Sequence, residues 1–172
     1  MCIIKISINE ARCFFVKRET LFLKAVVVLV GLPVLALCIF GLPQIVKEAA
    51  EYFSPYWVYP VFIVIYVSVI PFFFALVQAF KLLSYIDKNQ AFSELAVGTL
   101  KKIKYCAFAI SILFAASEPF LYLMAEKDDA PGIIVIGLVI IFASFVIAVF
   151  AAVLQKLLKN AIDIKSENDL TV

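Results

Sequence analysis

Four long runs of apolar residues, separated by short polar segments, dominate the chain. They occupy residues 25–43, 57–80, 105–125 and 132–154. Each run has about 20 residues or slightly more, and a helix of that length, at about 1.5 Å per residue, crosses a hydrocarbon core of roughly 30 Å. The runs are apolar on all sides, which favours helices over the alternating strands of a β-barrel. The pattern therefore predicts an all-α, polytopic membrane protein with four transmembrane helices.

A short cytoplasmic amphipathic helix is predicted between the second and third runs. Ser93 can cap its N-terminus, and Leu95 and Leu100 are among the apolar residues that recur at helical spacing. Its basic residues are Lys101, Lys102 and Lys104. Two interpretations are open: these lysines anchor the helix to anionic lipid, or they dock a soluble partner.

Composition identifies lipid as the medium around the apolar runs. Of the 172 residues, 65% are hydrophobic and 16% are charged, and the mean hydropathy is +1.08. Soluble domains are about half apolar and about a quarter charged. The polar residues of this chain are too few to cover a globule with this many apolar side chains. The lipid bilayer is therefore the first partner that we expect.

The positions of the cations predict the orientation in the membrane. Thirteen of the fifteen Lys and Arg residues lie before the first run, between the second and third, or after the fourth. Only Lys47 and Lys127 lie in the other two connections. Because cytoplasmic segments are enriched in Lys and Arg, both termini and the middle connection are expected on the cytoplasmic side of the cell membrane.

Three regions follow: a cytoplasmic leader at 1–20, a four-helix transmembrane domain at 21–155 and a cytoplasmic tail at 156–172. The leader lacks a small-residue cleavage site, and Asn9, Glu10 and Arg12 interrupt its apolar residues. One hypothesis is that Val16 corresponds to a GUG initiation codon, so that residues 1–15 are not translated in the native protein. The alternative is a genuine cytoplasmic arm, and the intact mass of the native protein distinguishes the two.

Residues for most enzyme and metal chemistry are missing from the sequence. Histidine is absent, and the four cysteines (Cys2, Cys13, Cys38 and Cys106) show no paired spacing. Motifs for phosphate binding, serine catalysis and zinc-dependent hydrolysis do not occur. The net charge of +2 gives no indication of nucleic-acid binding. We expect no enzyme activity, no metal or other cofactor, and no direct contact with nucleic acid.

Two polar side chains within the runs are candidates for an intramembrane polar site. Glu118 is the only acid inside a run, and such acids are costly in hydrocarbon and often serve as ion or proton sites. Its position near the outer end, beside Pro119, also allows a snorkelling side chain without such a role. Gln78 is expected to form a hydrogen bond between helices. Pro33, Pro71 and Pro119 are expected to kink the first three helices.

Small residues recur every four positions in the third and fourth runs. They are Ala107, Ser111 and Ala115 in the third run, and Ser144, Ala148 and Ala152 in the fourth. This spacing puts each set on one helix face and permits two backbones to approach closely. We expect the two faces to pack against each other, although alanine is common in membrane helices for other reasons.

The fourth run has no proline and is expected to continue as one helix into the tail, where cationic and apolar residues keep helical spacing. Glu167, Asn168 and Asp169 near its end are candidates for docking a partner. They could bind a basic regulator, or the lysines Lys101, Lys102 and Lys104 of the same chain. A frayed, solvated terminus is the alternative.

Several strings resemble one family of bacterial membrane proteins. They include TLFLK (20–24), GLPVLALC (31–38), QAFKLLSYIDKN (78–89) and SENDLTV (166–172). From about Val16 onward the chain resembles the YoaS-like family of small four-span proteins, domain of unknown function 2975. The resemblance implies a bacterial inner-membrane protein, often encoded beside a short helix-turn-helix regulator of transcription, and implies no catalytic residues.

The leading hypothesis is a non-enzymatic membrane partner of a small cytoplasmic DNA-binding regulator, which would bind the middle connection and the tail. A second hypothesis is a small channel or transporter-like subunit that uses Glu118 and forms a homo-oligomer, because four helices enclose little space. A third is an immunity-type protective membrane protein. Co-purification of a regulator supports the first, and Glu118-dependent flux in liposomes supports the second.

Overall fold

The computed structural model describes residues 20–52, 55–88, 90, 92–127, 129 and 131–170, and all regular secondary structure within these residues is helical. Residues 20–36 are α-helical and continue into η1 (Leu37–Gly41), α2 (Leu42–Tyr52), α3 (Pro55–Asp87), α4 (Glu94–Lys127) and α5 (Gly132–Leu170). Within the described residues, four helical stretches are long and apolar enough to cross a membrane: Thr20–Glu51, Val58–Asp87, Glu94–Lys127 and Gly132–Asn168. The all-α class and the four spans are confirmed. The leader, residues 1–19, lies outside the described residues.

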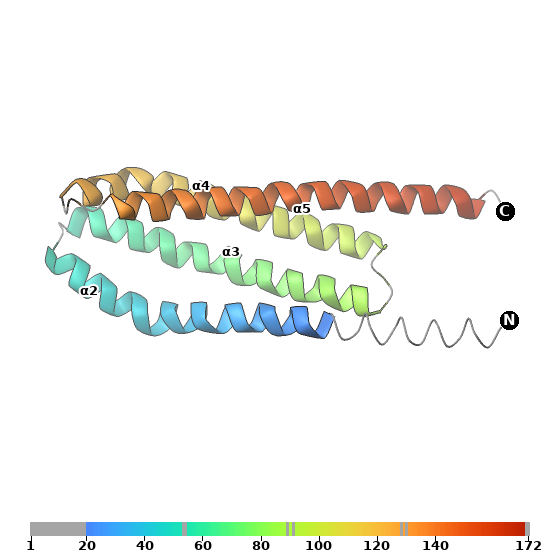
Figure 1. Cartoon of the computed structure of the whole chain (residues 1–172), viewed down its shortest axis with the longest axis horizontal. Helices are drawn as coiled ribbons and strands as arrows, with labels where there is room; N and C mark the ends of the chain where they lie inside the picture. The colour runs from blue at the N-terminus through green and yellow to red at the C-terminus, as the bar shows by residue number, and fades with distance from the viewer. Residues whose placement is uncertain are drawn as a thin grey trace.

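The first span is longer than predicted. Its apolar run ends at residue 43, but the helix continues through Pro43 to Tyr52. Proline lacks an N–H, and its ring clashes with the carbonyl four residues earlier. The chain widens just before it into the π-helix η1, in which the Leu42 N–H donates to the Leu37 carbonyl. Figure 1 shows the first span bending at this point, before α2. Packing of α2 on α3 stabilises a helix that the proline alone would disfavour.

The predicted amphipathic helix does not form a separate element in the described residues. Glu94 is the first residue of α4, which runs without interruption to Lys127. Ser93 does cap this helix, since its Oγ accepts a hydrogen bond of 3.4 Å from the Ala96 N–H. The basic residues that were assigned to a surface helix thus lie on the first turns of the third span.

The four spans run alternately up and down, and α4 packs along both α3 and α5. The helix beginning at residue 20, the end of α3, the start of α4 and the C-terminal part of α5 lie at the same end of the bundle (Figure 1). We call this the lysine-rich end, because Lys24, Lys81, Lys88, Lys101, Lys102, Lys104, Lys156, Lys159 and Lys165 lie toward it. We call the other end the opposite end.

The helix α5 projects well beyond the end of α3 and the start of α4 at the lysine-rich end, as Figure 1 shows. With 39 residues it is about 58 Å long, nearly twice the thickness of a hydrocarbon core. The expected continuation of the fourth span into the tail is therefore present as a single helix.

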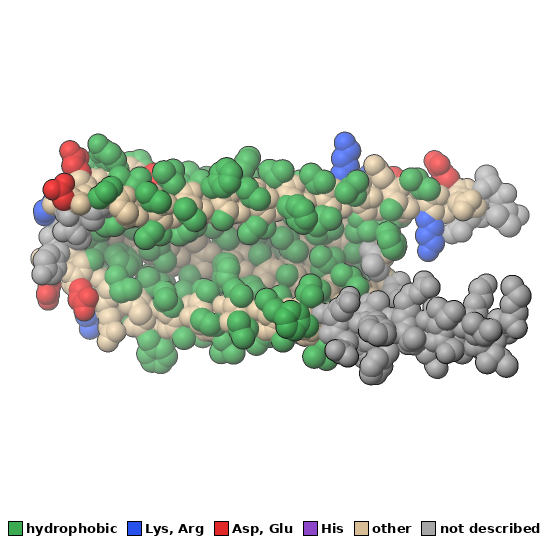
Figure 2. Space-filling model, in the orientation of Figure 1, with side chains coloured by type: hydrophobic (Ala, Val, Ile, Leu, Met, Phe, Trp, Pro, Cys, Tyr) green, Lys and Arg blue, Asp and Glu red, His purple; other side chains and the backbone are tan. Residues whose placement is uncertain are grey.

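Apolar side chains cover the outside of the bundle (Figure 2). Phe40, Ile70 and Phe142 are among the many large apolar residues that are exposed on three different spans. In water such a surface would drive aggregation, whereas in a bilayer it faces lipid. A buried cluster at the opposite end joins α2, α3 and α4 through Leu42, Val58, Val61, Phe62 and Met124.

Candidate functional site

An ion pair joins the first span to α3 at the lysine-rich end. The Lys24 ammonium pairs with the Asp87 carboxylate, which also accepts a hydrogen bond from the Thr20 hydroxyl. The Lys24 Nζ also lies 5.5 Å from the centroid of the Phe80 ring. In the sequence, Lys24 is only one of the cations that indicate orientation. Its partner Asp87 is 63 residues away along the chain, so residue spacing could not identify the pair.

An apolar groove of about 450 Å³ lies at the same end of the bundle, between α3, the start of α4 and the facing part of α5. We call it the terminal groove. It is lined by Leu82 and Ile86 of α3, Phe92 and Leu100 at the start of α4, and Leu154, Leu157, Leu158 and Ala161 of α5. Phe92 is 63% exposed, so a large aromatic side chain stands at its edge without being covered. The sequence pattern had indicated the lysines of this region but not the groove.

The candidate docking lysines have different surroundings. Lys101 and Lys102 are exposed on α4. Lys104 is half-buried: its Nζ lies 3.3 Å from Gln155 Oε1 of α5 and 5.0 Å from the centroid of the Tyr105 ring. Lys104 therefore joins α4 to α5, while the other two remain at the surface.

The candidate docking residues of the tail lie far from these lysines. Glu167 and Asn168 are exposed on the last turns of α5, and the backbone of Asp169 is helical there. Because Lys104 lies level with Gln155, Glu167 is twelve residues, or about 18 Å, further along the helix. In the described structure the tail does not fold back onto Lys101, Lys102 and Lys104.

The stripes of small residues lie on the two helices that pack most extensively. Ala107, Ser111 and Ala148 are buried, and the Ser111 hydroxyl donates to the Ile141 carbonyl of α5 at 3.3 Å. Ser144 and Ala152 are half-buried, but Ala115 is exposed. The six residues therefore do not form one uniformly buried face, because Ala115 is exposed while the other five are buried or half-buried.

Glu118 and Gln78 lie in opposite halves of the bundle. Glu118 is nine residues before the end of α4 at the opposite end, whereas Gln78 is nine residues before the end of α3 at the lysine-rich end. They are about 20 Å apart along the bundle axis, estimated at about 1.5 Å per residue. Gln78 is buried, with 3% exposure. The two candidates do not form a common site.

The Glu118 side chain packs against α5. Both of its carboxylate oxygens are buried and lack a hydrogen-bond partner among the described residues. A Cβ added to Gly137 of α5 would lie 2.5 Å from Glu118 Oε2 and 2.9 Å from Leu121 Cδ1. The absence of a side chain at Gly137 therefore makes room for the carboxyl group. Sequence reasoning identified the acid but missed the glycine.

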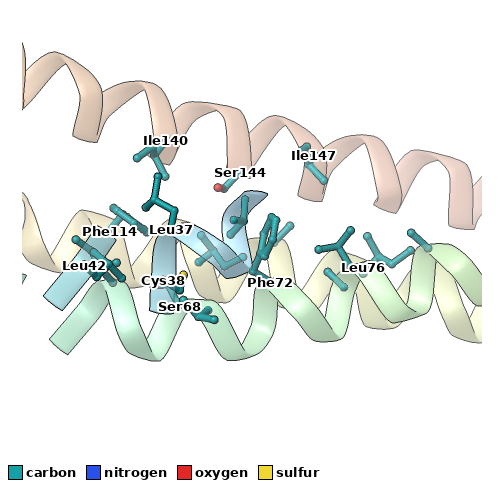
Figure 3. Close-up of a pocket in the computed structure, with 18 residues that line it drawn as sticks. Leu37, Cys38, Leu42, Ser68, Phe72, Leu76, Phe114, Ile140, Ser144 and Ile147 are labelled. Carbon is teal, nitrogen blue, oxygen red and sulfur yellow. The ribbon is translucent and has the colours of Figure 1, made fainter. Parts of the chain in front are cut away.

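A second cavity lies at mid-depth in the bundle, and we call it the central cavity. Its volume is about 490 Å³, and residues from all four spans line it (Figure 3). The labelled side chains of Leu37, Phe72, Phe114 and Ile147 come from the four different helices. Among the described residues that line it, Cys38, Ser68 and Ser144 are the only ones with a polar side-chain atom. Glu118 and Gln78 are not part of its wall.

The family assignment is supported by direct comparison. The family model described as protein of unknown function DUF2975 matches residues 44–172. The chain belongs to this family. It is also 69% identical over 158 residues to the uncharacterized membrane protein YoaS of Bacillus subtilis (strain 168). The matched region covers 91% of this chain and 99% of that protein. No solved structure matches the chain. The resemblance found in the sequence is confirmed, and the protein is a membrane protein of unknown function.

Proposed function

We propose that this protein is a non-enzymatic partner in the bacterial plasma membrane that binds a small cytoplasmic helix-turn-helix regulator at the terminal groove. The lysine-rich end faces the cytoplasm in this proposal, in accord with the enrichment of Lys and Arg in cytoplasmic segments. The family resemblance supplies the class of partner, since its members are often encoded beside such a regulator.

The terminal groove is the observation that carries the proposal. Its lining is apolar, it lies at the end where polar sequence is concentrated, and α5 extends past it as a second wall. Apolar grooves of this kind bind amphipathic helices through a few large side chains. The exposed cations around it, including Lys101, Lys102 and Lys156, favour a helix with acidic residues flanking its apolar face.

A matched pair of truncations tests the groove. Phe92 and Leu95 are similarly exposed, at 63% and 59%, but only Phe92 lines the groove. Phe92→Ala should weaken binding of the purified regulator to the protein in nanodiscs by about 30-fold, since loss of an aromatic hot spot costs about 2 kcal/mol. Leu95→Ala should change the Kd by less than about twofold.

Two results would contradict this proposal. The first is the absence of binding between the wild-type protein and the regulator encoded beside it. The second is equal weakening by Phe92→Ala and Leu95→Ala, which would place the contact elsewhere. Transcription of the adjoining genes should respond to Phe92→Ala in the same direction as to deletion of the whole protein.

The buried carboxyl of Glu118, which has no hydrogen-bond partner among the described residues, favours a second candidate, a small channel or transporter-like subunit. Proton flux into liposomes that contain the purified protein tests it. Flux that Glu118→Gln abolishes and Glu126→Gln leaves unchanged would support the transport function, because Glu126 is an exposed acid near the end of the same helix. Absence of flux above that of protein-free liposomes would contradict it.

A further inference from the structure

The central cavity is enclosed on three sides and open on the fourth. The helices α3 and α4 form its floor, and the first span and α5 form its two flanks. The elements η1 and α2 of the first span have little contact with α5. Figure 2 shows the molecule hollowed between these two flanks. Leu37 and Ile147 line the cavity and are nevertheless 57% and 54% exposed, so the opening lies between them.

The chemistry of the lining excludes a polar occupant. Of its few polar groups, the Ser68 hydroxyl already donates to the Val64 carbonyl of its own helix at 2.7 Å. An ordered water needs two to four polar partners, and an ion needs more. Only an apolar molecule finds matching contacts there, and the volume of about 490 Å³ is within the range of ligand pockets.

The position of the cavity along the bundle indicates which apolar molecule can enter. On α3 its wall runs from Ile65 to Ala79, fourteen residues or about 21 Å. The cavity is therefore longer than the roughly 15 Å thickness of one leaflet of the hydrocarbon core, which an acyl chain spans. The opening faces the hydrocarbon, so an acyl chain can enter from the side without crossing water.

Cations mark the end of the cavity that is nearer the lysine-rich end. Ala79 of the wall is two residues before Lys81, and Ile103 of the wall directly precedes Lys104. The Lys104 ammonium has three donors, and its bond to Gln155 uses one of them. Basic residues at the mouth of a pocket between membrane helices suit the phosphate of an anionic lipid.

We propose that the central cavity is a binding site for one anionic phospholipid, with an acyl chain between the first span and α5 and the phosphate near Lys81 and Lys104. The bound chain fills the space between η1 and α5, which have little contact with each other. The site is separate from the terminal groove and does not depend on binding of a regulator.

Substitutions that fill the cavity test the proposal. Ser144→Leu and Ala75→Leu place larger side chains in the wall from two different helices. Ala143→Leu is the matched control, because Ala143 is the exposed neighbour of Ser144 and lines no part of the cavity. Native mass spectrometry of the protein, purified from membranes and from nanodiscs containing phosphatidylglycerol, measures the bound lipid.

The wild-type protein and Ala143→Leu should each retain one phospholipid per chain. Both filling variants should retain it in a fraction lower by about fivefold or more, the effect of overpacking a binding pocket. Lys81→Gln should reduce the preference for phosphatidylglycerol over phosphatidylcholine. A phospholipid carrying a photoreactive acyl chain should label peptides that contain Leu37 or Phe72.

Three results would overturn the proposal. One is a wild-type protein without retained phospholipid, including one that carries only detergent. Another is equal retention by the wild type and both filling variants, which would place the lipid on the outer surface. The third is a dimer that Ser144→Leu and Ala75→Leu dissociate, since the cavity would then hold part of a second copy of the chain.

Discussion

The contact between Glu118 and Gly137 gives a sharp prediction about the packing of α4 on α5. The substitution Gly137→Ala places a Cβ 2.5 Å from Glu118 Oε2 and 2.9 Å from Leu121 Cδ1, both closer than van der Waals contact allows. Overpacking of this kind costs about 1–3 kcal/mol. Alanine in place of glycine inside a helix recovers up to about 1 kcal/mol. The net expectation is a loss of about 1 kcal/mol of the free energy of unfolding.

A double-mutant cycle isolates the clash from the change in helix propensity. In the Glu118→Ala background the carboxyl group is gone, and Leu121 can shift into the vacated space. Gly137→Ala should then stabilise the protein by about 0.5–1 kcal/mol, because only the propensity gain remains. The sign of the effect therefore reverses between the two backgrounds.

The free energies are measured by titrating the purified protein in mixed micelles with sodium dodecyl sulfate and following near-ultraviolet circular dichroism. Glu118→Ala itself is expected to cost little, since its oxygens have no hydrogen-bond partner among the described residues. If Gly137→Ala stabilises the wild-type protein and the Glu118→Ala variant equally, then the carboxyl group does not occupy the space beside Gly137.

Three further predictions concern other contacts. Asp87→Asn should cost about 1 kcal/mol of unfolding free energy in the same titration by leaving Lys24 without its counter-ion, whereas Asp163→Asn on the exposed part of α5 should cost nearly nothing. Ala148→Leu should cost about 2 kcal/mol, because Ala148 is 4% exposed, and Val146→Leu on the lipid-facing side should not; equal losses would contradict the close approach. Deleting residues 167–172 should leave thermal stability unchanged while lowering the effect of the protein on transcription, and unaltered transcription would assign no recognition role to the tail.

The number and type of the spans could be predicted because each run satisfies a physical requirement by itself. A helix that pairs all its backbone groups and is long and apolar enough for the bilayer needs no information from the rest of the chain. Helix ends were predicted less well. The helix passes Pro43 because Leu42 packs into a cluster with Val58 and Phe62, and such contacts cannot be read from local sequence.

The candidate sites depended more on contacts distant in the sequence. Glu118 and Ala148 could be selected one at a time, from polarity or small size. The partner of each is set by the rotation of one helix about its axis relative to another, which spacing does not specify. For this reason Gly137 was missed, Ala115 was assigned to a face from which it points away, and the terminal groove was not foreseen.

The proposed function requires the lysine-rich end, with the terminal groove, to face the cytoplasm. Single cysteines at Lys47, Asp129 and Asn168, introduced into a variant without the four native cysteines, test this in intact cells with a membrane-impermeant maleimide. Labelling at Lys47 and Asp129 from outside, with Asn168 labelled only after permeabilisation, is the expected result. Labelling of Asn168 from outside would contradict the account, because a cytoplasmic regulator could not then reach the groove.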